Sequence, residues 1–189
     1  ALPDQIDEAT FHLAEIDYFG GRFQAAVTRL DGITVNLKAD YANDAIHLQA
    51  FLEENQKSAP EALRAFAGAE FLARRGRNTQ AISIFQELLA TYPEAPLVDD
   101  ALMAMASLQV GAGLYAEAIT SYERLLSQFR ESSVALDRAQ FRLAEVYRTG
   151  FRDRARAIVA YEKLLGDYPF SVLSAQARKR IRELRGDVF

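Results

Sequence analysis

The sequence contains no cysteine and no tryptophan, and only two of its 189 residues are histidines. Without cysteine the chain has no disulfides, no thiolate metal ligands and no cysteine nucleophile. Its 10 glycines and 5 prolines are too few for a collagen-like or linker-like chain. Charged residues interrupt every apolar run before it reaches the roughly 18 residues of a membrane-spanning helix. We therefore expect a folded, helix-rich chain without a transmembrane segment.

Sequence patterns that carry catalysis are also missing. The chain has no Gly-x4-Gly-Lys or Gly-x-Gly-x-x-Gly phosphate loop and no Gly-x-Ser-x-Gly nucleophile motif. His12 and His47 lie in separate helical patterns, without a second ligand at metal-binding spacing. The pair Asp99-Asp100 comes at a predicted helix start, where acidic residues stabilise a helix. We predict no catalytic residue, no metal site and no cofactor, and we expect that the protein is not an enzyme.

A repeated pattern is the strongest positive signal. The motif Ala-Ile-x-x-aromatic begins at Ala81, Ala118 and Ala157, at spacings of 37 and then 39 residues. A fixed period of this size is typical of repeat architectures. Small residues stand 12 or 13 positions before each motif and before Ala26, namely at Ala14, Ala69, Ala106 and Ala144. Such residues allow two helices to approach closely, so each unit is predicted to be a helix-turn-helix hairpin.

Glycines separate the two helical patterns of each predicted hairpin. They are Gly20-Gly21, Gly76, Gly113 and Gly150. Glycine adopts positive φ without strain, and helices commonly end at such a residue. We therefore predict a tight turn with positive φ at each of these positions.

The pattern predicts an all-α fold, an α-α superhelix that forms a single repeat domain over residues 1–189. Hairpins are expected at 6–33, 60–93, 97–130 and 134–169, followed by a capping helix at 171–185 with Ile181 and Leu184 facing inward. Residues 34–59 are expected to be an irregular segment with an unpaired helix near 41–55. Two arrangements remain open there: either residues 60–75 pair with this helix, or it packs against the array as an extra helix.

These hairpins resemble the tetratricopeptide repeat (TPR) family. Leu143-Ala144-x-x-Tyr147 and Ala81-x3-Phe85 followed by Pro93 match the family pattern best. The early tryptophan of the family is absent, Leu30 stands where an aromatic is usual, and the third unit lacks the proline. The resemblance implies a right-handed solenoid whose first helices line a concave groove, and it implies a non-catalytic scaffold that binds another protein or peptide.

The groove-lining positions form three columns when the first helices are aligned on their small residues. The columns are Phe11, Phe66, Met103 and Phe141; Glu15, Glu70, Ser107 and Glu145; and Tyr18, Ala73, Val110 and Arg148. Exposed aromatic side chains usually mark interaction sites. The columns therefore predict a partner segment with apolar anchors and, because of the glutamates, a basic flank. The alternative is that the phenylalanines pack between neighbouring helices, and the sequence does not separate the two.

The charge distribution provides a second hypothesis. Residues 1–129 carry 9 Lys and Arg against 18 Asp and Glu, whereas residues 130–189 carry 13 against 8. Copies of the chain could stack through the acidic N-terminal and basic C-terminal parts as a self-assembly unit. A secondary basic surface, Arg178, Lys179, Arg180 and Arg182, is expected mainly to be the solvated face of the capping helix. Binding of an anionic partner there is the remaining alternative, and nucleic acid is not expected because aromatic residues do not interleave the run.

The location of the protein is open from the sequence. The repeat style is similar to that of the C-terminal part of bacterial TPR proteins, among them the helical lipoprotein of outer-membrane barrel assembly and the periplasmic coordinator of the Tol-Pal system. That resemblance favours the bacterial cell envelope over the cytoplasm. The chain begins with Ala1 and not with Met, so we expect a processed product or an excised fragment, with the number of upstream repeats unknown.

Overall fold

The computed structural model describes residues 3–34, 41–129 and 136–186 of the chain. Within these ranges the chain is helical, with ten α-helices, one π-helical turn and no strand. None of the described helices is long and apolar enough to cross a membrane. The chain divides into two compact units, Ala1–Val98 and Asp99–Phe189.

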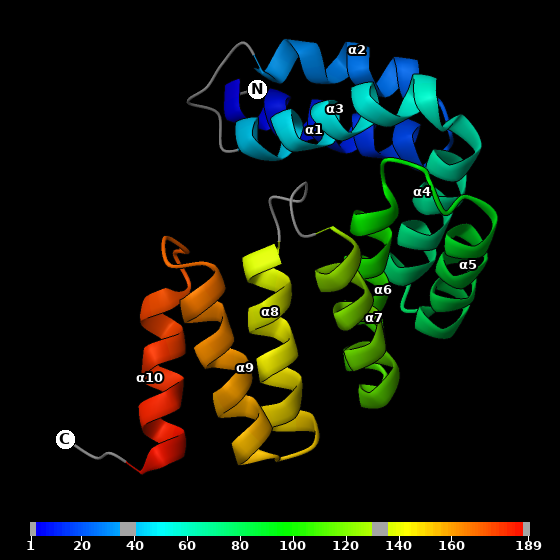
Figure 1. The fold of residues 1–189 in the computed structure, drawn as a ribbon. Coiled ribbons are helices and arrows are strands. Elements are labelled where there is room, and N and C mark those ends of the chain that lie inside the picture. The colour runs from blue at the N-terminus through cyan, green and yellow to red at the C-terminus, as the bar shows by residue number, and fades with distance from the viewer. Residues whose placement is uncertain (1–2, 35–40, 130–135, 187–189) are drawn as a thin grey trace. The chain divides into compact units, whose positions relative to one another are not determined.

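The first unit contains two helical hairpins and one additional helix (Figure 1). Its helices are α1 (Pro3–Phe19), α2 (Phe23–Thr34), α3 (Ala42–Ser58), α4 (Pro60–Arg74) and α5 (Asn78–Thr91). Helix α1 pairs with α2, and α4 pairs with α5. The first helices of the two hairpins, α1 and α4, also touch each other. This contact brings predicted groove positions of both hairpins onto neighbouring helices.

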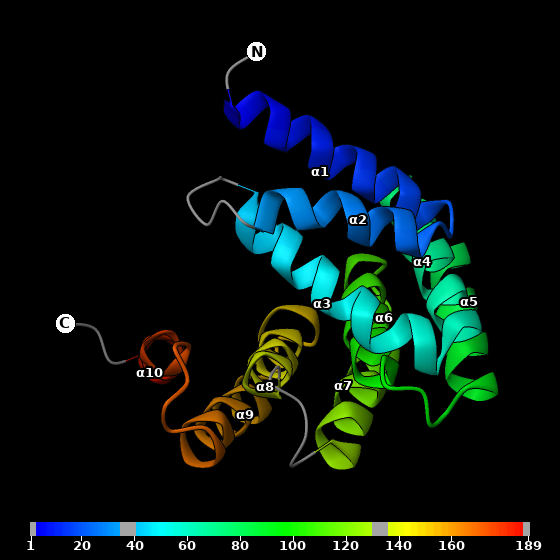
Figure 2. The ribbon, with the colours of Figure 1, turned by 90° about the horizontal axis from the view of Figure 1, so that it is seen from above.

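Helix α3 is the additional helix that the sequence predicted near residues 41–55. It packs mainly against α2 and makes less contact with α4, as both views of the ribbon allow the reader to follow (Figures 1 and 2). Ala42, Ala45 and Leu52 form its buried face. Of the two arrangements considered, the structure supports an extra helix packed against the array, because α4 takes α5 as its hairpin partner. Residues 35–40 of the predicted irregular segment lie outside the described residues.

The second unit contains the remaining five helices. They are α6 (Val98–Gly111), α7 (Tyr115–Gln128), α8 (Leu136–Glu145), α9 (Arg154–Asp167) and α10 (Ser174–Arg185), with a π-helical turn, η1 (Val146–Gly150), after α8. The Ser121 hydroxyl donates to Gln109 Oε1 at 2.8 Å and so joins α6 to α7. Helices α8, α9 and α10 lie side by side (Figure 1). The predicted start of the fourth hairpin, residues 134 and 135, lies outside the described residues.

The repeated motif forms the core of the hairpins. Ala81, Ala118 and Ala157 are fully buried, as are the aromatic rings four residues after them. The alanine lets the second helix approach the small residue of the first, and the ring then fills the space one turn further on. In the last hairpin this core extends to α10, where Ile181 is buried and Leu184 packs against the cluster, as the sequence predicted.

Three of the predicted glycine turns are confirmed. Gly21, Gly76 and Gly113 have φ values of +70°, +73° and +76°. In each turn the following residue donates its N–H to the carbonyl five residues earlier, as from Arg22 to Asp17 at 2.8 Å. Such bonds satisfy carbonyl groups at the end of the first helix.

The prediction for Gly150 is wrong, because Arg152 takes the positive φ in this turn. This hairpin has one extra residue between its two small positions, and here Asp153 donates its N–H to the carbonyl of Tyr147, six residues earlier. The π-helical turn η1 accommodates the additional residue. Gly150 serves another purpose: a Cβ atom there would lie 2.7 Å from the ring of Tyr115.

Candidate functional site

The phenylalanines of the first predicted column are buried and form part of the core. Phe11, Phe66 and Phe141 all lie inside their units. Phe66 of α4, for example, packs against Phe51 of α3 and Phe85 of α5, with ring centroids 5.0 Å and 5.3 Å apart. Packing between neighbouring helices, the alternative left open by the sequence, is therefore the arrangement seen for these three side chains. A partner does not reach them without a rearrangement of the helices.

The polar members of the columns connect α1 to α4 in the first unit. The Tyr18 hydroxyl donates to Glu70 Oε2 at 2.6 Å. Burial raises the pKa of Glu70, while the hydrogen bond from Tyr18 acts in the opposite direction. Arg74 pairs with Glu15 at 2.5 Å, and His12 Nδ1 lies 2.8 Å from the other oxygen of Glu15. Both predicted glutamates are thus engaged within the unit.

A hollow of about 270 Å³ lies between α1 and α4 beside these pairs. We call it the α1–α4 hollow; its lining residues are His12, Glu15, Ile16, Phe19, Phe71, Arg74 and Arg75. Ile16 is 58% exposed and Phe71 is 41% exposed. The guanidinium of Arg74 lies 5.5 Å from the ring centroid of Phe19, and that of Arg75 lies 5.6 Å from the ring centroid of Phe71. These distances are in the range of cation–π contacts.

Glu15 is the one residue of this lining that was predicted from the sequence. Ile16 and Phe71 each follow a predicted glutamate position by one residue, and Phe19 and Arg74 follow the third column by one residue. On a helix, one residue corresponds to a rotation of about 100°. The periodicity therefore carried no signal for which of the neighbouring columns points outward.

In the second unit the predicted residues hold helices together. Glu145 pairs with Arg148 at 2.6 Å, accepts a hydrogen bond from the Tyr161 hydroxyl, and lies 3.4 Å from Arg180 Nε on α10. Burial acts to raise the pKa of Glu145, but the donors from Arg148 and Tyr161 lower it overall. The pKa of Arg148 is raised, chiefly by its hydrogen bond to Glu145. This cluster connects α8, α9 and α10.

The other predicted residues of the second unit are separate from this cluster. Met103 is partly buried, and Ser107, which is exposed on α6, donates its hydroxyl to the Met103 carbonyl at 2.9 Å. On α10, Arg178, Lys179 and Arg182 are exposed, whereas Arg180 is partly buried against Glu145 and Glu183. The predicted basic surface is therefore not uniform, since Arg180 attaches the helix to the core.

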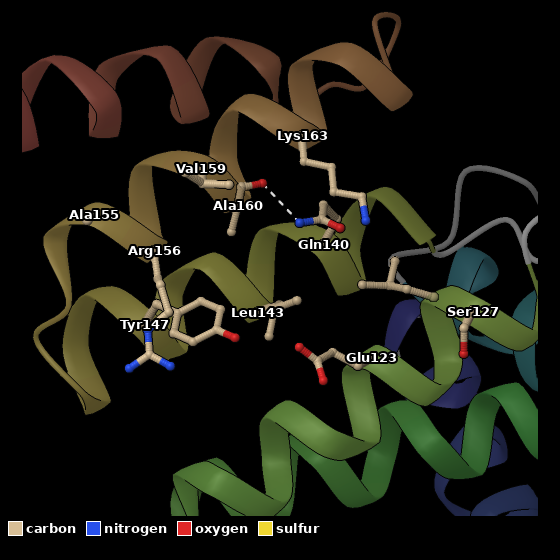
Figure 3. A pocket seen from close by; sticks show the side chains of 11 residues that line it. Glu123, Ser127, Gln140, Leu143, Tyr147, Ala155, Arg156, Val159, Ala160 and Lys163 are labelled. Carbon is tan, nitrogen blue, oxygen red and sulfur yellow. Dashed lines mark hydrogen bonds between the residues drawn. The ribbon is translucent and has the colours of Figure 1, made fainter.

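A second hollow, which the sequence did not indicate, has a volume of about 530 Å³ and lies between α7, α8 and α9. We call it the α7–α9 hollow. Its apolar lining is Leu126, Leu143, Ala155, Val159 and Ala160, and its polar lining is Glu123, Ser127, Gln140, Tyr147, Arg156 and Lys163 (Figure 3). Gln140 is buried and donates from Nε2 to the Ala160 carbonyl at 2.9 Å, which leaves its amide oxygen facing the hollow (Figure 3).

Charged groups lie at the rim of the α7–α9 hollow. Arg156 pairs with Asp153 at 2.6 Å, and its guanidinium lies 5.0 Å from the ring centroid of Tyr147. Burial, and then the neighbouring Glu123 carboxylate, raise the pKa of Tyr147. Lys163 forms no ion pair with another described residue. One wall of the hollow is thus basic and the opposite wall carries a single carboxylate.

Metal-ligating side chains do not cluster in either hollow. The described residues contain no group of three or more His, Asp or Glu side chains that could hold a metal ion. His12 is engaged with Glu15, and His47 is exposed on α3. Both hollows combine exposed apolar side chains with a few charged groups, which is the composition of a surface that binds another molecule.

Comparison with known proteins agrees with this description. The tetratricopeptide repeat model matches residues 44–95, 100–132 and 138–171, which is more than half of the chain. No curated protein sequence matches. A crystal structure from Podosopora anserina, of a protein described as a kinesin light chain with nearly identical TPR-like repeats, matches with a TM-score of 0.59 and 14% identity, covering 99% of this chain and 89% of that one. The structural match concerns the fold, and the family match, with the hairpins described above, shows that the chain belongs to the tetratricopeptide repeat family.

Proposed function

We propose that the protein is a non-catalytic scaffold that binds a segment of a partner protein in the α1–α4 hollow. TPR proteins generally act as scaffolds that bind other proteins or peptides. The observation that carries the proposal is the exposure of Phe71 beside Ile16 in a concave site. Exposed apolar side chains gathered in a hollow gain free energy when a partner removes them from water. An apolar side chain of the partner enters between these two residues.

The charges around the hollow favour an acidic residue next to the apolar anchor of the partner. Arg75 stacks on Phe71 and forms no ion pair with another described residue. Glu15 is already neutralised by Arg74, and Glu70 is hydrogen-bonded by Tyr18. These two predicted glutamates are therefore already engaged, and they do not favour the basic flank expected from the sequence. A guanidinium without a partner binds a carboxylate well, because the two groups can form paired hydrogen bonds.

The predicted groove residues have two roles in this proposal. Tyr18 and Glu70 connect α1 to α4 beside the hollow, Glu15 lines it, and Phe11 and Phe66 are buried in the core of the unit. In the second unit Phe141, Glu145 and Arg148 hold the last hairpin, and Met103 lies partly buried beneath Ser107. Ser107 is exposed on α6.

The test is selection of peptides from a displayed random library on the full chain, followed by measurement of the affinity of a selected peptide by fluorescence polarisation. We expect selected peptides to share a bulky apolar residue near an acidic one. The variants F71A and R75E should each weaken binding about tenfold or more, since an anchor residue of an interface typically contributes at least 1–2 kcal/mol.

The matched control is F170A, because Phe170 is an almost fully exposed phenylalanine outside the hollow. Circular dichroism and the unfolding midpoint establish that all three variants are folded. If F71A and R75E bind the selected peptides as tightly as F170A does, the α1–α4 hollow is not the site.

A further inference from the structure

The α7–α9 hollow has the shape of a short groove for a helix. Its floor is formed by Gln140 and Leu143 of α8 and Tyr147 of η1, and its walls are α7 and α9 (Figure 3). The lining residues of α9 run from Ala155 to Lys163, which at 1.5 Å per residue is about 12 Å or two helical turns. Val159 on the rim is 64% exposed. An apolar floor between two helices is the kind of surface that binds an amphipathic helix.

Helix α1 carries an apolar stripe on the face opposite its buried side. Ile6 is 54% exposed and Leu13 is 46% exposed, and Ala9 and Ile16 are exposed as well. The spacing of these four residues, i, i+3, i+7 and i+10, places them in one line along the helix. The stripe extends over ten residues, about 15 Å, which matches the length of the groove. Soluble proteins do not usually leave such a continuous line of large apolar residues uncovered.

The charges of the two surfaces are complementary. Helix α1 contains five acidic residues and no Lys or Arg. Glu15 and Asp17 are paired with arginines of their own unit, and Glu8 is exposed near the stripe. The wall of the groove formed by α9 presents Arg156 and Lys163, and Lys163 forms no ion pair with another described residue. An acidic helix that lies on this wall gains attraction at the rim while its apolar stripe covers the floor.

We propose that the α7–α9 hollow binds α1 of a second copy of this chain. In this contact Ile6, Leu13 and Ile16 cover Leu143 and Val159, and acidic residues of α1 lie near Lys163. The Gln140 amide oxygen, which has no donor among the described residues, accepts a hydrogen bond from the polar flank of the incoming helix, where Gln5 and His12 lie.

The proposed contact joins different surfaces of the two copies. Each copy then retains one free α1 stripe and one free α7–α9 hollow, so association adds copies one after another and rises with protein concentration. The contact shares Ile16 and His12 with the α1–α4 hollow, whereas Ile6, Leu13 and Val159 do not line that site, so a change at any of these three leaves the lining of the α1–α4 hollow intact.

The test is sedimentation velocity of the full chain over a range of concentrations, with two variants that each remove one side of the contact. L13E places a charge in the stripe, and V159E places a charge in the groove. Both side chains are exposed, so neither variant should unfold. We expect self-association at least tenfold weaker in each variant, whereas V172E, a charge at an exposed valine outside both surfaces, associates like the parent chain.

An equimolar mixture of the two variants decides whether the contact joins different surfaces. L13E keeps its groove and V159E keeps its stripe, so the mixture should form a dimer that grows no further, although each variant alone remains monomeric. K163E should also weaken association, and less so at high salt. A parent chain that stays monomeric at every concentration, or a mixture that stays monomeric, overturns the proposal.

Discussion

At the scale of single residues, the hydrogen bond between Tyr18 and Glu70 is the clearest test of how α1 is held against α4. Burial raises the pKa of Glu70 above its ordinary value of 4.5. A carboxyl with a raised pKa in the folded state binds its proton more tightly than in the unfolded chain. Its contribution to the free energy of unfolding therefore falls as the pH rises from that ordinary value through the folded pKa. The Tyr18 hydroxyl offsets part of this loss, because it donates to the ionised carboxylate.

The variant Y18F should reduce the free energy of unfolding by about 1–2 kcal/mol at neutral pH, because it leaves a half-buried carboxylate without its donor. Because the folded-state pKa of Glu70 is raised, more of its carboxyl is protonated in mild acid than at neutral pH and needs the donor less, so the loss should be smaller in mild acid. Urea unfolding at both pH values measures this difference. Y115F is the control, since the Tyr115 hydroxyl has no hydrogen-bond partner among the described residues. A loss independent of pH would contradict this role of Glu70.

The phenylalanine column shows what the sequence alone decides about a site and what it leaves open. The repeat register placed Phe11, Phe66 and Phe141 at equivalent positions of their hairpins, and the structure has all three buried. An aromatic residue at a helix position gives the same periodic signal whether it faces a neighbouring helix or a partner. Phe66 is covered by Phe51 of α3, a helix outside the hairpin pattern, so only tertiary structure shows the burial.

At the scale of elements, α10 is attached to the last hairpin by one apolar face and one ion pair. Ile181 is buried in the core cluster and Arg180 lies against Glu145, while Arg178 and Lys179 are exposed. The basic run is thus mostly the solvated surface of a terminal helix, which repeat proteins require for solubility. The apolar contact should contribute far more to the stability of the unit than the exposed charges do.

The variant I181A should reduce the free energy of unfolding by about 2–4 kcal/mol, because it removes buried methyl groups and leaves a cavity. The double variant R178Q/K179Q should change it by less than about 0.5 kcal/mol. Chemical denaturation monitored by circular dichroism gives both values. An equal loss in the two variants would mean that the exposed charges hold α10 in place.

The element pattern was largely predictable from the sequence, and the exceptions have physical causes. The period of small and aromatic residues located the helices of all four hairpins and the capping helix, since each must bury one face. The spacing of 13 residues from Ala144 to Ala157, one more than in the other hairpins, was visible in the sequence, but its structural consequence was not. A hairpin can accommodate one extra residue either in the turn between its helices or as a π-helical segment. Here the segment is π-helical, and the ring of Tyr115 lies against Gly150 at its end. The partner of α3 was open as well, because its own pattern resembles that of a first helix.

At the scale of the whole molecule, contacts are mainly between helices that are neighbours in sequence, as in other repeat proteins. The chain divides into two compact units, Ala1–Val98 and Asp99–Phe189. The sequence predicted a single repeat domain. That the two units unfold together stays a prediction. Because stability in such arrays is close to a sum over repeats and their interfaces, a local defect should be felt mostly in its own unit.

The variant G150A tests this, since its Cβ would lie 2.7 Å from the Tyr115 ring and something must shift. We expect a loss of about 1–3 kcal/mol, seen by hydrogen exchange as reduced protection in α7, α8 and α9, with protection in α1 to α5 unchanged. The matched change G68A, in α4, meets no heavy atom within 4 Å. It should increase protection in α4 and α5 by about 0.5–1 kcal/mol, because alanine favours a helix more than glycine does. If G150A instead lowers protection equally from α1 to α10, the two units unfold as one cooperative domain. A clash at η1 can lower the protection of helices without contact to η1 only when those helices unfold together with it.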